Sequence, residues 1–139
     1  TDTKGKVTIT NALFGKYFFT VDETRTEAKT VYLIEAKHSS RAKLPSKNDI
    51  KDGLVKMMLY TNLQNVKVGA TPLALKVQIR LTSNKLVSSI TSKTSDEVLA
   101  KFCADNLIDA ANREFLKKLF QEARENKFTI ILEHAETAK

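Results

Sequence analysis

One short stretch of this chain places a carboxylate and an amine where they could act together. Glu35 and Lys37 stand two positions apart at the end of the β-favouring stretch 30–37. In a β-strand the side chains of residues i and i+2 project from the same face, so these two groups lie side by side next to Leu33. A carboxylate can bind a hard divalent cation such as Mg²⁺, and an ammonium beside it can position a water or offset charge on a phosphate. The alternative is an ordinary surface Glu–Lys pair, worth at most about 1 kcal/mol.

A second carboxylate for such a metal site is harder to place. Asp22 is the upstream candidate, 13 residues before Glu35. If a symmetrical hairpin joins their strands, Glu35 lies opposite Phe18 and the two carboxylates stand about 13 Å apart, which is too far for one metal ion. A bulge or an asymmetric turn would shorten that distance. The other interpretations are that Asp49 or Asp52 supplies the second ligand, that a preceding helix absent from this chain does, or that the site has decayed.

The charge of the chain favours a polyanionic partner. There are 23 Lys and Arg against 16 Asp and Glu, a formal net charge of +7, and such a balance favours nucleic acid first and an anionic membrane surface second. Basic residues follow the Glu35–Lys37 pair in a loop and helix and return on the wet face of a later strand. The predicted phosphate contacts are His38, Arg41, Lys43, Lys47, Lys51, Lys56, Lys76 and Arg80. The alternative for the helix is a solvated face. Tyr60 could stack on a base, although a packed tyrosine is the commoner arrangement.

Size and composition predict one domain spanning residues 1–139. The hydrophobic fraction of 42% and the charged fraction of 28% are typical of a globular chain, and no apolar run approaches the length of a membrane span. The chain does not begin with Met, which suggests a piece of something longer. Cys103 is the only cysteine, so an internal disulfide and a Cys-built metal site are excluded. We expect it to be a buried thiol in a reducing, cytoplasmic setting.

Residue patterns predict the elements that hold these side chains. Strands are expected at 7–14, at 16–22 and at 30–37, forming an antiparallel meander, with residues 1–6 loose and 23–29 a charged turn. Ser46 and Asp49 indicate a helix start after a basic loop, and an apolar stripe of Ile50, Leu54, Met57 and Met58 follows.

The second half of the chain alternates between strand and helix patterns. Residues 73–82 alternate strictly between apolar and polar, which predicts a half-buried strand. Thr94 and Glu97 form a capping box, and the helical pattern after it falters near 105–106, so we expect a kink or two helices. Residues 128–133 read as a last strand. The order predicts an α/β sandwich with helices on a mixed central sheet: a β-β-β-α-β core, C-terminal helices and a final strand.

The sequence Glu35-Ala36-Lys37 closing a third strand, with Asp22 upstream and a helix directly after, resembles the PD-(D/E)xK nuclease superfamily, which includes many type II restriction endonucleases and junction resolvases. The resemblance covers roughly residues 16–82, and the run Leu-Ile-Glu-Ala-Lys-His-Ser-Ser is similar to restriction endonuclease sequences. The superfamily often has Pro before its first acid, where this chain has Val21.

This resemblance implies a restriction-endonuclease-like fold, DNA as substrate and phosphodiester hydrolysis with Mg²⁺ as cofactor. It implies Asp22, Glu35 and Lys37 as catalytic residues, with the two acids as metal ligands, and it suggests a homodimer on a palindromic target. Two other functions remain open. A nucleic-acid-binding module of the same fold that no longer cuts is favoured by the missing partner for Glu35, and a basic protein-interaction domain is the third. Nothing resembles a nucleophile elbow or a Gly-rich phosphate loop.

Overall fold

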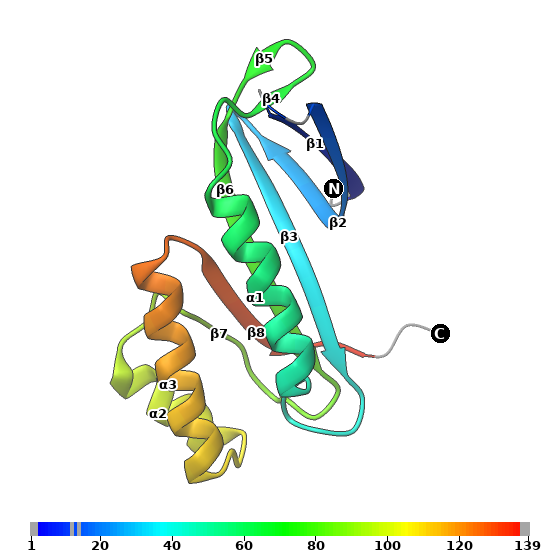
Figure 1. Cartoon of the computed structure of the whole chain (residues 1–139). Helices are drawn as coiled ribbons and strands as arrows, with labels where there is room; N and C mark the ends of the chain where they lie inside the picture. Colours follow the sequence, from blue (N-terminus) through cyan, green and yellow to red (C-terminus); the bar gives the residue numbers. More distant parts are fainter. Residues whose placement is uncertain (1–2, 12, 14, 137–139) are drawn as a thin grey trace.

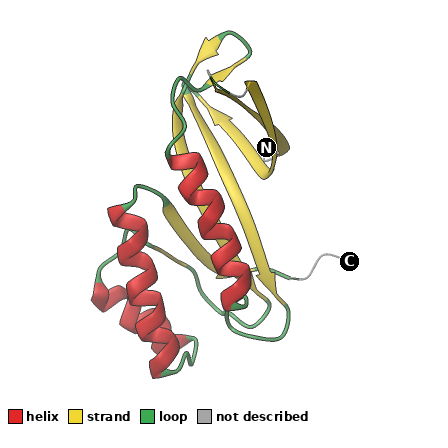
Figure 2. Cartoon of the chain, viewed as in Figure 1, coloured by secondary structure: helices red, strands yellow, loops and turns green. Residues whose placement is uncertain are grey.

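The structure is a computed structural model that describes residues 3–11, 13 and 15–136. In chain order the elements are β1 (Thr3–Asn11), β2 (Gly15–Glu27), β3 (Thr30–Ser39), α1 (Lys47–Thr61), β4 (Lys67–Val68), β5 (Thr71–Pro72), β6 (Ala74–Ser83), β7 (Ile90–Thr91), α2 (Asp96–Asp105), α3 (Ala110–Glu125) and β8 (Thr129–His134). Figures 1 and 2 show the helices beside a long twisted sheet. Six strands form that sheet in the order β1-β2-β3-β6-β8-β7, while β4 and β5 form a separate small hairpin.

The main sheet is mixed, as the sequence predicted. β1, β2 and β3 form the expected antiparallel meander, whereas β3, β6 and β8 run parallel and β7 is antiparallel to β8. Parallel neighbours require a crossover connection. The first crossover contains α1 and the second contains α2 and α3, so helices and parallel strands alternate along the second half of the chain.

The N-terminal strands are longer than predicted. The segment expected to be loose begins β1 at Thr3, and the predicted charged turn 23–29 instead continues β2 as far as Glu27. The turn takes only two residues, and Ala28 accepts the positive φ of 51° that a tight hairpin requires. Two residues expected in the first strand, Ala12 and Phe14, lie outside the described part of the chain.

The predicted start of α1 is confirmed, but its buried face differs from the prediction. The Ser46 hydroxyl accepts a hydrogen bond from the Asp49 amide at 3.1 Å, as the capping signal indicated. Met57 is fully buried, whereas Met58, expected beside it in the core, is 67% exposed. Tyr60 is completely buried, which is the packed arrangement and not the base-stacking one. A Cβ placed on Gly53 would stand 2.3 Å from Ile79 Cδ1, so this glycine lets α1 approach β6 closely and sets which face turns inward.

The C-terminal half follows the sequence pattern closely. The alternation in β6 buries Val77, Ile79 and Leu81, and the faltering helical pattern separates α2 from α3. The capping residue of α2 is Ser95, whose hydroxyl accepts from the Val98 amide, rather than the predicted Thr94. The short strands β4, β5 and β7 were not predicted, because two residues carry no readable periodicity.

One hydrophobic cluster joins the helices to the sheet. Buried side chains of α1, α2 and α3 pack with those of β3, β6 and β8, and Cys103 lies among them, 1% exposed, as predicted. None of the described helices combines the length and apolar character that crossing a membrane would require.

Candidate functional site

The structure brings the Asp22 and Glu35 carboxylates together. The pair of β2 and β3 residues farthest from their turn is Glu23 with Ile34. One residue beyond this pair stand Asp22 on β2 and Glu35 on β3. The two carboxyl groups are within hydrogen-bonding reach of each other. The separation expected from a symmetrical hairpin is therefore wrong, because the two-residue turn shifts the register of β2 against β3.

A β-bulge positions Asp22 at this point. Between the pairs Gly5–Val21 and Thr3–Thr24 the register of β1 with β2 shifts, leaving two residues on β2 opposite one on β1. Such a bulge re-aims side chains and bends the strand. The Asp22 Oδ2 atom then accepts a hydrogen bond from the Ala36 amide at 3.0 Å, in place of a main-chain partner. In Figure 1, β2 and β3 run together near their hairpin turn and separate beyond it.

Glu35 is buried, 4% exposed, while Asp22 is exposed. The Tyr60 hydroxyl donates a hydrogen bond to Glu35 Oε1 at 3.3 Å. Burial raises the pKa of Glu35, and so do the charge of Asp22 and the hydrogen bond between the two carboxyls, while Lys56 and Tyr60 act in the opposite direction. The pKa of Tyr60 is also raised, first by burial and then by Glu35, so its hydroxyl remains a donor. Solvent therefore reaches the acid pair from the side of Asp22.

One amine acts on the acid pair, and a second projects from the same face of β3 as Glu35. Lys37 is half-buried on the same face as Glu35, and its Cε would lie 3.8 Å from a Cβ placed on Gly53, so the absence of that side chain leaves room for it. Lys56 comes from α1: its charge lowers the pKa of Glu35, and its Nζ lies 5.9 Å from the centroid of the Phe19 ring. The site therefore combines two carboxylates, two amines and a buried phenol.

The alternative acids do not join the site. Asp49 and Asp52 are exposed on α1 and are not among the groups that shift the pKa of Glu35. Within the described residues no group of three or more His, Cys, Asp and Glu side chains could hold a metal ion. A metal at this site would thus have two protein carboxylates and complete its shell with water or substrate oxygens, as Mg²⁺ commonly does.

The predicted phosphate contacts divide between two faces of the sheet. Lys76 and Arg80 stand in register with Tyr32 and Ala36, which alternate with Glu35, so both lie on the face opposite the acid pair. Arg80 is ion-paired with Glu23 and, at 3.8 Å, with Glu133.

The other predicted contacts are spread over the end of β3, the loop after it and α1. The His38 Nδ1 atom lies 2.7 Å from Thr82 Oγ1. Lys43 donates to the Lys85 carbonyl at 3.2 Å, and Lys47 Nζ lies 5.2 Å from the centroid of the Phe115 ring. Arg41 and Lys51 are exposed. Of the eight predicted residues, Lys56 is the one whose charge lowers the pKa of Glu35.

The sequence did not indicate that Tyr60 contacts Glu35. A buried tyrosine hydroxyl usually has a hydrogen-bond partner, but nothing in the order of residues says which one. The sequence does show that Lys56 and Tyr60 are four residues apart and so project from one face of α1. That spacing links Tyr60 to a residue that was predicted to lie at the site.

Replacing Glu35 by Gln is expected to stabilise the metal-free protein at neutral pH. A carboxyl whose pKa is raised on folding holds its proton more tightly in the native state, so stability falls as pH rises from the unfolded value near 4.5 through the folded value. Gln keeps the acceptor for Tyr60 and carries no charge. We expect a Tm about 3 °C higher at pH 7.5, and a gain that disappears well below pH 4.5, where Glu35 is protonated in both states. Thermal unfolding in the presence of a chelator measures this change in Tm. The control is Glu114→Gln, on the exposed face of α3. A Tm of Glu35→Gln below that of the control at pH 7.5 would contradict it.

Chemically, the site offers adjacent oxygen ligands for a hard cation and amines that can face a phosphate. Comparisons with protein-family models, with curated proteins and with solved structures find no match to this chain, so its function is argued from the geometry above.

Proposed function

We propose that this chain is a Mg²⁺-dependent endodeoxyribonuclease domain of the PD-(D/E)xK, restriction-endonuclease-like kind. The observation that carries the proposal is the contact between Asp22 and Glu35 on two diverging strands, with Lys37 two residues further along the same face. The arrangement of three antiparallel strands, a helix and a parallel strand is consistent with the core that this resemblance implies.

The acid pair fits a hard divalent cation. Two carboxylates in contact repel each other when both are ionised, and the raised pKa of Glu35 reflects burial first and this repulsion second. A bound cation would remove this penalty, and Mg²⁺ accepts one or two carboxylates together with substrate phosphate oxygens. When bound, it supplies Lewis acidity and a bound water of lowered pKa.

Each residue of the site has a distinct role in this proposal. Asp22 is exposed and therefore meets the phosphodiester, while its hydrogen bond to the Ala36 amide orients its carboxylate. Tyr60 on α1 holds the buried carboxylate of Glu35 in place by donating a hydrogen bond to it. Lys37 faces the attacking water or the phosphate and offsets the negative charge that develops there. Lys56 supplies a second positive charge beside the pair.

The proposal is tested by incubating supercoiled plasmid DNA with the protein. With Mg²⁺ we expect nicked and linear products, and none with a chelator. Asp22→Asn retains the acceptor for the Ala36 amide but loses the charge, and we expect it to slow cleavage by about 100-fold or more, as removal of a key electrostatic group does. Glu122→Gln on α3 serves as the matched loss of a carboxylate elsewhere. Cleavage that survives in Asp22→Asn, or that ignores the chelator, contradicts the proposal.

A second candidate is a nucleic-acid-binding module of the same fold that does not cut. The near-complete burial of Glu35 favours it, because a ligand that water barely reaches binds a hydrated cation less readily. In that case DNA binding weakens steeply with salt, while no condition with divalent cations yields products.

A further inference from the structure

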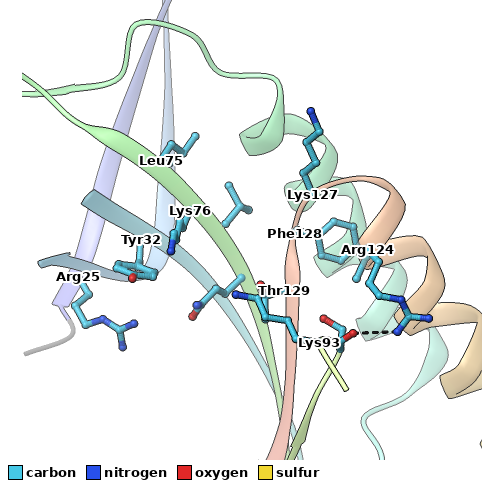
Figure 3. Close-up of a pocket in the computed structure, with 13 residues that line it drawn as sticks. Arg25, Tyr32, Leu75, Lys76, Lys93, Arg124, Lys127, Phe128 and Thr129 are labelled. Atoms are coloured by element: carbon cyan, nitrogen blue, oxygen red, sulfur yellow. Dashed lines mark hydrogen bonds between the residues drawn. The ribbon is translucent and has the colours of Figure 1, made fainter. Parts of the chain in front are cut away.

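A second feature of the molecule is a cavity beside the part of β6 that extends past β8. β8 begins at Thr129, which pairs with Gln78, so the first four residues of β6 extend past the start of β8. Tyr32 and Lys76 line this space and are in register with each other, on the face opposite Glu35. The cavity measures about 480 Å³. Figure 3 shows β6 on one side of it and the turn from α3 into β8 on the other.

The lining of this cavity is strongly basic. Among the described residues that line it, the five charged side chains are all cations, and none is a carboxylate. They are Arg25, Lys76, Lys93, Arg124 and Lys127. They come from separate parts of the chain, and Figure 3 shows Arg25 and Lys76 on the side of Tyr32 with Lys93, Arg124 and Lys127 across the gap. Like charges gathered around one space repel, and an anion placed among them relieves that repulsion.

Several of these cations are held in place by neighbours. The Arg25 guanidinium lies 4.4 Å and the Lys76 ammonium 5.9 Å from the centroid of the Tyr32 ring. Arg124 Nη1 donates to the Ser92 carbonyl at 3.0 Å, which leaves its other donors for a ligand. Among the described residues, Glu27 forms an ion pair with Arg25, at 3.1 Å, and none pairs with the other four.

We propose that this cavity binds a small polyphosphorylated anion, of the class of nucleoside di- and triphosphates. Its volume lies in the range of roughly 300–1,000 Å³ that small-molecule sites occupy. Guanidinium groups pair with phosphate through parallel hydrogen bonds, and ammonium groups add point charge. The inference is independent of the proposed nuclease function, because none of the residues assigned to the acid-pair site lines the cavity.

The test is a calorimetric titration of the chain with ATP and with pyrophosphate in about 0.15 M salt. We expect saturable binding, weakened at least about 10-fold in the double variant Lys76→Gln/Lys93→Gln, because two of the five charges are lost. The matched control is Lys117→Gln/Lys118→Gln, on the exposed face of α3. This variant loses the same charge outside the cavity, and its affinity should change less than about 2-fold. All four lysines are exposed, so both variants should keep the wild-type Tm.

Three results would overturn the proposal. The first is an absence of saturable binding of ATP and pyrophosphate, and the second is an equal loss of affinity in the two double variants, which would mean net charge alone. The third result concerns a 20-nucleotide single strand. If this strand binds tightly and loses affinity in the cavity variant, while ATP neither binds nor competes, the cavity binds a nucleic-acid backbone. In contrast, ATP binding that the single strand does not displace supports the proposal.

Discussion

Lys37→Met is expected to slow plasmid cleavage by about 100-fold to 1,000-fold while leaving Mg²⁺ binding close to that of the wild type, since removing one group that stabilises transition-state charge typically costs this much. Lys37 projects from the same face of β3 as Glu35, but its amine is not a ligand for Mg²⁺. Met preserves the unbranched stem that fills the space beside Gly53. Cleavage rate and Mg²⁺ titration therefore separate two roles that a single assay would merge.

Glu35→Gln provides the contrasting result. Without this carboxylate the acid pair is lost, so both Mg²⁺ affinity and cleavage should fall. Added Mg²⁺ should raise the Tm of Lys37→Met, because a ligand that binds the native state stabilises it, and should leave the Tm of Glu35→Gln unchanged. Lys118→Met, on the exposed side of α3, controls for loss of one positive charge. If Lys37→Met cleaves as fast as this control, Lys37 has no role in the chemistry.

The second large effect is on stability. Asn106→Ala is expected to lower the free energy of unfolding by about 3 kcal/mol, because buried groups left without partners cost about 1–3 kcal/mol each. Asn106 is 1% exposed at the end of α2. Its Oδ1 accepts from the Val87 amide at 2.7 Å, and its Nδ2 donates to Ser88 Oγ at 2.8 Å and to the Phe102 carbonyl at 2.9 Å. The side chain thus ties the loop after β6 to the end of α2. Urea denaturation measures the change.

A matched control for this substitution exists one helix later. Asn126 occupies the same capping position at the end of α3 and donates to the Glu122 carbonyl at 2.9 Å, but it is exposed. Because water replaces those bonds, we expect Asn126→Ala to cost less than about 1 kcal/mol. Equal losses in the two variants would show that the cap, and not the buried network, is what matters.

The strands and helices with strong periodicity were predictable. The alternation of β6, the apolar run of β3 and the cap before α1 depend on local preferences, which neighbouring residues in the chain express. The mixed sheet followed from the order of those elements. The length of β2 was not predictable, because its last five residues carry little apolar signal and its tight turn contains neither Gly nor Pro.

The candidate site shows where sequence reasoning ended. Glu35 and Lys37 were found because their relation is local, two residues along one strand. The contact between Glu35 and Asp22 was not predictable, because the register that brings them together depends on the two-residue turn between β2 and β3. Likewise, Tyr60 meets Glu35 only because Gly53 lets α1 settle closely on β6.

The order of amino acids, then, was enough to establish the long helices and strands, the net positive charge and the Glu-x-Lys motif. The folded chain was needed to pair the two acids, to divide the basic residues between opposite faces and to form the basic cavity. The reason is physical: backbone preference and side-chain periodicity act over a few residues, whereas a site depends on register and packing between segments, where a shift of one residue sends every side chain to the other face.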